Sequence, residues 1–106
     1  MKTITAKELK EKIDKGEDFV LIDVLSKESF EAKHIKGSIN IPTSELGQRV
    51  NELPDKDKEI IVYCASKTCP ASPAAARHLE DLGYTNVVDF EDGLAGWIEA
   101  GFSLEE

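Results

Sequence analysis

Residues 60–83 read IIVYCASKTCPASPAAARHLEDLG, an apolar run followed by a short polar loop and a segment with helical spacing. The apolar run at 60–64 is too short for a helix and rich in branched residues, as expected for a strand of a parallel sheet that is buried on both faces. After the loop, we expect Ser72 as the N-cap of a helix, Pro73 at its first position and Gly83 at its end. This stretch therefore predicts a strand, a loop and a helix in succession.

The rest of the chain repeats this alternation of strands and helices. A capping box, in which the Thr5 hydroxyl and the Glu8 carboxylate each accept a backbone N–H, predicts a first helix that ends near Lys15. Strands that alternate with helices predict an α/β layered domain around a mainly parallel sheet, and the length fits one domain over residues 1–106. The other expected elements are strands at 19–24, 38–42 and 86–90 and helices at 27–33, 44–53 and 93–101.

Composition and charge exclude several classes of partner. The chain has 106 residues, a net charge of −8 and 41% hydrophobic residues, which is an ordinary globular balance. A negative field repels nucleic acid and anionic lipid, so neither is expected as a partner. We find no signal-peptide core and no apolar stretch of membrane-spanning length. We therefore expect a soluble, cytoplasmic monomer without a cofactor, whose two thiols are reactive or buried rather than joined in a structural disulfide.

Cys64 is the first candidate for chemistry, because it lies at the carboxyl end of a predicted strand and before a helix amino terminus. Ligands of open α/β sheets bind at that position. Loop N–H groups and the oriented peptides of the helix favour a thiolate there, and lowering a cysteine pKa by ~1.5 units needs only about 2 kcal/mol. The alternative is that Cys64 is a small buried hydrophobic residue at the end of a strand.

Cys69 precedes Pro70, which favours an extended conformation and places this cysteine in the loop. It is either a resolving or persulfide-accepting thiol, or an incidental loop residue. A zinc site is not expected. The gap between Cys64 and Cys69 exceeds the spacing usual for zinc, and His34 and His78 lie far from both in the pattern.

Three motifs together resemble the single-domain rhodaneses, a family of sulfurtransferases. They are LIDVLSKESFEAKHIKGSINIP at 21–42, IIVYC at 60–64 and HLEDLGYTNVVDFEDGLAGWIEAGF at 78–102. The resemblance covers nearly the whole chain and implies a three-layer fold with a five-stranded, mainly parallel sheet flanked by helices. It also implies that Cys64 carries a persulfide held by the amides of the following loop. The residues of that loop are Ala65, Ser66, Lys67, Thr68 and Cys69.

The chain departs from the family pattern at three places. Leu25 stands where many members have Arg, and Asp92–Gly93 replaces a pair of glycines. The active-site loop is longer when Ser72 is aligned with the family's helix-opening Ser, and Lys67 is its only cation. A wider loop goes with phosphatase or arsenate-reductase activity in relatives, but those reactions use a loop Arg to bind the oxyanion. Since Arg77 already lies within the helix, sulfur transfer ranks first.

We therefore expect Cys64 to attack the outer sulfur of a donor such as thiosulfate and to pass it to a thiol or protein acceptor in two half-reactions. Loop N–H groups from Ala65 through Cys69 would stabilise the persulfide anion. Two alternatives stay open. One is a binding or regulatory module that keeps the fold without turnover, and the other is a dithiol redox protein that uses Cys64 and Cys69.

Overall fold

The computed structural model describes residues 1–106 and contains one sheet of five strands, all parallel, in the order β1-β5-β4-β2-β3. The predicted mainly parallel sheet of five strands is confirmed. β4 lies at its centre, which explains why the sequence of this strand is apolar throughout. The strands are β1 (Lys2–Thr3), β2 (Val20–Asp23), β3 (Ile39–Asn40), β4 (Ile60–Tyr63) and β5 (Val87–Phe90).

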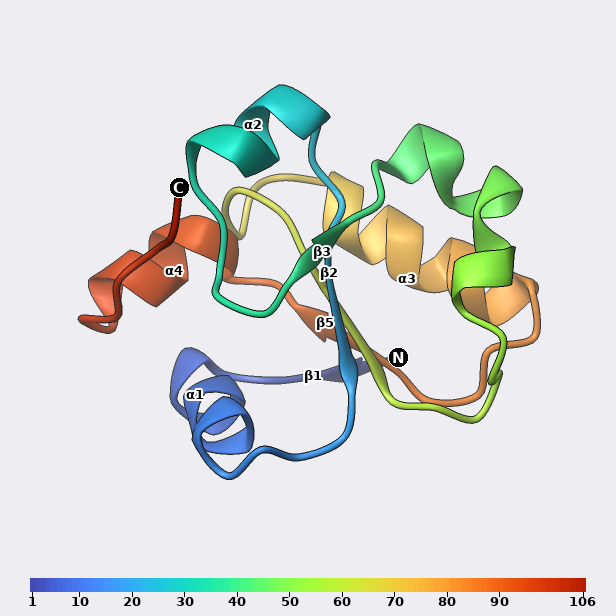
Figure 1. Ribbon diagram of the computed structural model, residues 1–106, viewed down its shortest axis with the longest axis horizontal. Coiled ribbons are helices and arrows are strands. Elements are labelled where there is room, and N and C mark those ends of the chain that lie inside the picture. Colours follow the sequence, from blue (N-terminus) through green and yellow to red (C-terminus); the bar gives the residue numbers. More distant parts are fainter.

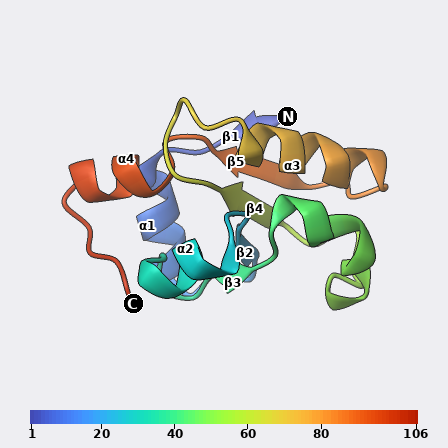
Figure 2. The same cartoon turned by 90° about the horizontal axis from the view of Figure 1, so that it is seen from above.

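Helices cover both faces of the sheet, so the expected α/β layering is confirmed (Figure 1). One face carries α1 (Ala6–Asp14) and α4 (Gly93–Glu99), and the other carries α3 (Ala71–Asp81). Two short 3-10 helices, η1 (Thr43–Gln48) and η2 (Val50–Glu52), lie on the same side as α3 (Figure 2). The remaining helix, α2 (Lys27–Ala32), buries none of its residues.

Alternation along β4 divides the core in two. Ile60, Val62 and Cys64 face α3, whereas Ile61 and Tyr63 face α1 and α4. Side chains of a strand point alternately to opposite faces, so an apolar run without interruption supplies both cores at once. Each branched side chain that is fully buried stabilises the fold by about 1.5–3 kcal/mol.

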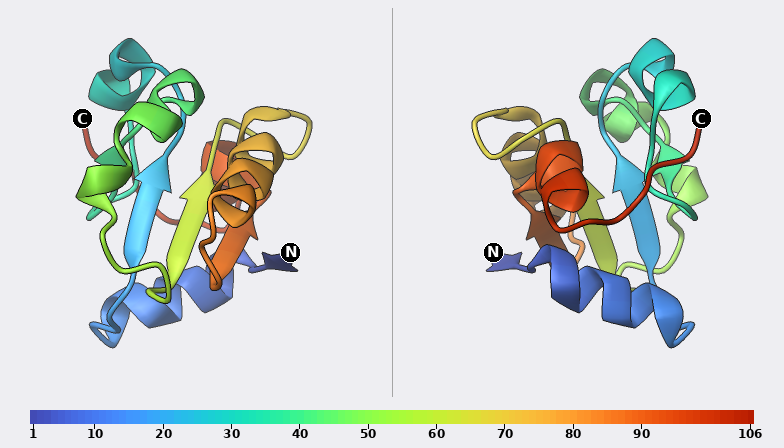
Figure 3. Two further views of the ribbon diagram at one scale, coloured as in Figure 1. Left: turned by 90° about the vertical axis from the view of Figure 1, so that its right-hand side faces the viewer. Right: turned by 90° about the vertical axis from the view of Figure 1, so that its left-hand side faces the viewer.

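The carboxyl ends of the strands meet at one edge of the sheet. β2 and β4 are in register with Asp23 beside Tyr63, and β4 and β5 with Tyr63 beside Phe90. Figure 3 shows the loop after β4 rising beyond the arrowheads of the strands, at the entrance to α3. Cys64 is therefore placed at the edge where a parallel sheet binds its ligands.

The start of α1 is as expected. The Glu8 N–H donates to the Thr5 hydroxyl at 3.1 Å, and the Thr5 N–H donates to the Glu8 carboxylate at 2.9 Å, which completes the capping box. The hydrogen bond from Thr5 lowers the pKa of the Glu8 carboxyl. No helix of the structure has both the length and the apolar character that crossing a bilayer requires.

The helix expected at 44–53 is wrong, because this segment forms the separate 3-10 helices η1 and η2. Gly47 and the β-branched Val50 disfavour an α-helix in its middle. The Tyr84 hydroxyl donates to the Leu53 carbonyl at 2.6 Å and holds the end of the segment against the core. Tertiary contacts therefore decide its conformation.

The expected start of α3 is also wrong. The helix begins at Ala71, with Pro70 as its N-cap, so Ser72 and Pro73 are the second and third helical residues. Ser72 is completely buried and its hydroxyl caps nothing. Its side chain turns toward the sheet instead, where the space beneath the first turn of α3 encloses it.

Candidate active site

Cys64 lies directly after β4 and is completely buried. Its sulfur accepts a hydrogen bond from the Ser72 N–H at 3.4 Å, and its thiol donates to the Cys69 carbonyl at 3.5 Å. The other neighbours belong to the apolar core beneath α3. The sulfur thus sits at the boundary between this core and the amino terminus of a helix.

Cys69 is half-buried in the loop, beside Cys64. Burial raises the pKa of the Cys69 thiol, but hydrogen bonds from the Cys64 thiol and from the N–H groups of Ala71 and Ala65 outweigh this effect and lower it. One amide of the predicted cradle, that of Ala65, therefore faces the sulfur of Cys69, together with the amide of Ala71 at the start of α3.

The pKa of Cys64 is raised, first by burial and second by the hydrogen bond with Cys69, and the hydrogen bonds from Ser72 do not offset this. The expectation that position 64 favours a thiolate is therefore wrong for this arrangement of the loop. The pKa is thus shifted in opposite directions at the two thiols, upward at Cys64 and downward at Cys69. The assignment of Cys64 as the nucleophile stays a prediction.

The first turn of α3 provides the amides for both sulfurs. The Ala71 N–H faces Cys69 and the Ser72 N–H faces Cys64, while Pro73 has no N–H to offer. The next amide, of Ala74, donates to the Pro70 carbonyl at 3.2 Å. Helix amino termini favour anions; the lowered pKa of Cys69 agrees with this, whereas burial outweighs the effect at Cys64.

The start of α4 orients the peptides that follow Cys64. The Leu94 N–H donates to the Cys64 carbonyl at 3.0 Å, and the Ala95 N–H donates to the Ala65 carbonyl at 2.9 Å. In a trans peptide the N–H points opposite to the carbonyl, so the amides of Ala65 and Ser66 are turned away from α4. The Ala65 N–H reaches the cysteine side of the loop in this way.

Gly93 allows α4 to approach this closely. Its φ is +62°, and a Cβ atom there would lie 2.3 Å from the Cys64 carbonyl oxygen. The second glycine of the family's pair is therefore retained as Gly93, where the loop requires it. Asp92, at the position of the first glycine, has an ordinary helical backbone conformation.

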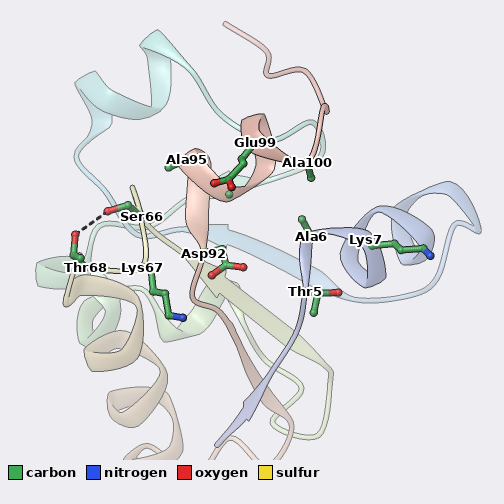
Figure 4. A pocket seen from close by; sticks show the side chains of 11 residues that line it. Thr5, Ala6, Lys7, Ser66, Lys67, Thr68, Asp92, Ala95, Glu99 and Ala100 are labelled. Atoms are coloured by element: carbon green, nitrogen blue, oxygen red, sulfur yellow. Dashed lines mark hydrogen bonds between the residues drawn. The ribbon is translucent and has the colours of Figure 1, made fainter.

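The predicted loop residues do not all face the cysteines. Ser66, Lys67 and Thr68 line a pocket of about 670 Å³ between the loop, α4 and the start of α1 (Figure 4). The Ser66 and Thr68 hydroxyls lie 3.2 Å apart, as the dashed line in Figure 4 marks, and Lys67 is exposed. Neither cysteine lines this pocket. The structure thus brings Ala65 and Cys69 to Cys64 and sets the middle of the loop on the outer side.

Asp89 is a residue of the site region that the sequence analysis missed. It lies in β5 and is 1% exposed, and one of its carboxylate oxygens has no hydrogen-bond partner. Burial raises the pKa of the Asp89 carboxyl, and the charge of Glu91 raises it further. Ser72 and the positive charge of Arg77 act in the opposite direction and lower it. Its position in the strand was the available signal, because alternation from Val87 places Asp89 on the face beneath α3.

The histidines take no part in this site. The His34 ring stacks on Phe30 with 3.9 Å between centroids, and its Nδ1 lies 2.7 Å from the Phe30 carbonyl oxygen. His78 is exposed on α3. No group of three or more side chains of the metal-binding types comes together in the structure.

Comparisons with known proteins identify the family of this chain. Residues 5–100 match the family model described as a rhodanese-like domain. The chain is 39% identical over 103 residues to an HTH-type transcriptional regulator of Mycobacterium tuberculosis, covering 97% of this chain and 44% of the regulator. It is 31% identical over 83 residues to a thiosulfate sulfurtransferase of Coxiella burnetii, covering 78% of this chain and 75% of that protein.

A solved structure of a rhodanese-related protein has the same fold. The rhodanese-related protein of Thermoplasma volcanium superposes with a TM-score of 0.82 at 34% identity, and the match covers 99% of this chain and 98% of that one. The chain spans about half the length of the first curated relatives that it matches.

Proposed function

Since the chain belongs to the rhodanese-like domain family, a family of sulfurtransferases, we propose that it carries sulfane sulfur as a persulfide on Cys64. The donor is a small anion such as thiosulfate, and the acceptor is a thiol or a protein. We further propose that the chain acts as a monomer in the cytoplasm, without a nucleic-acid or membrane partner. The likeness to a thiosulfate sulfurtransferase supports the choice of donor.

The observation that carries this proposal is the place of the Cys64 sulfur. It lies against the Ser72 amide at the start of α3, with the Cys69 thiol and the Ala65 and Ala71 amides beside it. An anionic outer sulfur attached to Cys64 would therefore meet backbone donors and a helix amino terminus. These donors support the proposal, because they would offset part of the cost of burying a charged persulfide.

In the first half-reaction the Cys64 thiolate attacks the outer sulfur of thiosulfate. A new sulfur–sulfur bond forms on Cys64, the sulfur–sulfur bond of the donor breaks, and sulfite leaves with the electron pair. In the second half-reaction the acceptor attacks the outer sulfur of the persulfide, and Cys64 leaves as a thiolate. The two steps predict ping-pong kinetics.

Cys69 is placed to act between these steps. As a thiolate it can attack the inner sulfur of the Cys64 persulfide, forming a disulfide between positions 64 and 69 and releasing hydrosulfide. It can instead take the outer sulfur and become the persulfide itself, with Cys64 as the leaving thiolate. Both steps balance without a further oxidant or reductant.

The test is the mass of reduced protein after incubation with thiosulfate. We expect the wild-type chain to gain the mass of one sulfur atom, Cys69→Ser to gain it as well, and Cys64→Ser not to gain it. Sulfur loading and transfer at the wild-type rate in Cys64→Ser would show that Cys64 is not the carrier.

A dithiol redox protein is the second candidate, favoured by the ionisable Cys69 thiol beside the Cys64 thiol. Its mark would be a reversible disulfide of defined potential that forms faster than any persulfide.

The third candidate is a regulatory module without turnover, which gains support from the likeness to part of a transcriptional regulator. Cysteines that do not react with alkylating reagents at neutral pH would favour this module.

A further inference from the structure

Three polar groups lie together beneath the first turn of α3. Cys64 follows β4 on the face of the sheet that α3 covers, and Asp89 of β5 pairs in register with Val62 on that face. Ser72 belongs to the first turn of α3, which packs over both of these strands. All three residues are at most 1% exposed.

Two of these groups have unused hydrogen-bonding capacity. The Ser72 hydroxyl oxygen and one carboxylate oxygen of Asp89 are buried without a hydrogen-bond partner in the chain. A buried polar group left unsatisfied costs about 1–3 kcal/mol, and folded proteins keep few of them. The structure has one other buried side-chain oxygen without a partner, on Asp23, and the two beneath α3 share their face of the sheet with the candidate nucleophile.

The Ser72 side chain connects the other two. The helix α3 packs over both β4 and β5, so its buried Ser72 lies over the strands that lead to Cys64 and carry Asp89. The Ser72 side chain also opposes the effect of burial on the pKa of each of these groups. Its own amide already donates to the Cys64 sulfur at 3.4 Å. A hydroxyl can accept one hydrogen bond while it donates another, so a rotation of this group can join the thiol to the carboxylate.

We propose that Asp89 is a positioning residue that takes up the Cys64 proton through the Ser72 hydroxyl. The thiol proton passes to the Ser72 oxygen as the hydroxyl proton of Ser72 passes to the Asp89 carboxylate. One sulfur–hydrogen bond breaks and one oxygen–hydrogen bond forms at the carboxyl group, with no other reactant. The result is a Cys64 thiolate above a neutral Asp89.

The advantage of this transfer is that the charge moves from one buried group to another while the number of buried charges stays the same. Burial penalises each anion, and two neighbouring anions in a medium of low dielectric repel strongly. The space under α3 therefore holds one negative charge, either on Asp89 or on Cys64. Arg77 favours a negative charge on Asp89, and Glu91 disfavours it. An ionised Cys69 disfavours a negative charge on Cys64.

The inference deepens the proposed persulfide function and rests on it for its purpose, but the proton transfer precedes any sulfur donor. It can therefore be measured by alkylation of Cys64 with iodoacetamide, followed at the level of the peptide by mass spectrometry. With the internal acceptor, a fraction of thiolate persists well below the pH at which the thiol loses its proton to water.

We expect Asp89→Asn and Ser72→Ala to slow alkylation of Cys64 about tenfold or more at about pH 6 and to leave it unchanged or faster at about pH 9. Ser72→Thr keeps the hydroxyl and should restore the reactivity at low pH. Asp81→Asn, which removes an exposed carboxyl from the same helix, serves as the control and should match the wild type.

Equal or faster alkylation of the Asp89→Asn variant at about pH 6 would overturn the inference, because the carboxylate would then only repel the thiolate. The same loss at every pH would overturn it as well, since it indicates a structural role. If Asp89→Asn does not fold, the pair Ser72→Ala and Ser72→Thr decides the question. If the alkylation profile is as expected but the protein gains no sulfur from thiosulfate, only the persulfide function is refuted.

Discussion

The two cysteines of this chain lie five positions apart and have opposite surroundings. Cys64 is completely buried, accepts one backbone N–H and has a raised pKa, whereas Cys69 is half-buried, faces two amides and the Cys64 thiol, and has a lowered pKa. Burial raises the pKa of both thiols, but it is more complete at Cys64 and is the largest cause of the shift there, whereas hydrogen bonds outweigh it at Cys69. The lesson is that a place at the end of a strand does not by itself ionise a thiol.

Burial and activation therefore fall on different residues. Cys69 is the more exposed thiol and has the lowered pKa, whereas Cys64 is enclosed and has the raised pKa. Within the proposed function, this arrangement would keep a loaded sulfur away from solvent while leaving one thiol accessible. The predictions below test that contrast, beginning with the change expected to have the largest effect.

Gly93→Ala should disrupt the environment of Cys64 most strongly. The new Cβ would lie 2.3 Å from the Cys64 carbonyl oxygen at a φ of +62°, so strain and overlap together should lower the free energy of unfolding by about 3 kcal/mol. Gly16→Ala is the matched control, because Gly16 has a φ of +65° and nothing within 4 Å of the added atom.

We expect the control to lose only about 1 kcal/mol. Urea denaturation of the two variants gives the comparison. Equal losses would mean that the approach of α4 to the loop is not a constraint on the site.

Cys69 should react with iodoacetamide about tenfold faster than Cys64 at neutral pH, or more, because it is both more exposed and more readily ionised. Peptide-level mass spectrometry measures the two rates in one sample. Cys69→Ser should then speed alkylation of Cys64, since the charge and hydrogen bond of Cys69 raise the pKa of Cys64. A faster Cys64 in the wild-type chain would contradict the contrast drawn above.

Asp89→Asn should stabilise the fold by about 1 kcal/mol at neutral pH. Burial raises the pKa of Asp89 in the folded state, so its contribution to stability is fully present below the pKa of the unfolded chain and is lost as the pH rises through the folded value. The variant should therefore lose its advantage as the solution is acidified. Thermal unfolding over a pH series, with Asp81→Asn as the control, measures this.

Lys67→Ala should have the smallest effect. Lys67 is exposed, makes no ion pair and lies on the outer side of the loop. We expect sulfur loading from thiosulfate to slow about twofold at low salt and to be unchanged at high salt, as for weak steering of an anion. A loss of more than about tenfold would place Lys67 in the binding site itself.

Local chemistry explains which parts of the fold the sequence predicts. Branched apolar runs such as Ile60–Tyr63 and the capping box of Thr5 and Glu8 have one favourable conformation each, and the structure contains both. β1 has only two residues and is defined by its pairing with β5, which leaves no local signal. The family resemblance, rather than periodicity, indicated a fifth strand.

The site was predictable in position but not in electrostatics. The motif placed Cys64 at the strand end, yet the direction in which the loop amides point depends on hydrogen bonds from Leu94 and Ala95, some thirty positions away in the chain. Serine is a residue type that favours the N-cap, but Pro70 takes that place at the start of α3. The helix begins at Ala71, and Ser72 is buried in its first turn. Alternation along β5 assigns Asp89 to a face of the sheet, but its place beside Val62 and near Cys64 depends on the pairing of β5 with β4.

The hydrogen bonds from α4 to the carbonyls of Cys64 and Ala65 make the last helix a mechanical support for the loop. A force or binding event that draws α4 outward would let both peptide planes turn over, and the amide of Ala65 would then leave the sulfur side. The affinity of the loop for a charged sulfur is thus set in part by a helix that contributes no side chain to it.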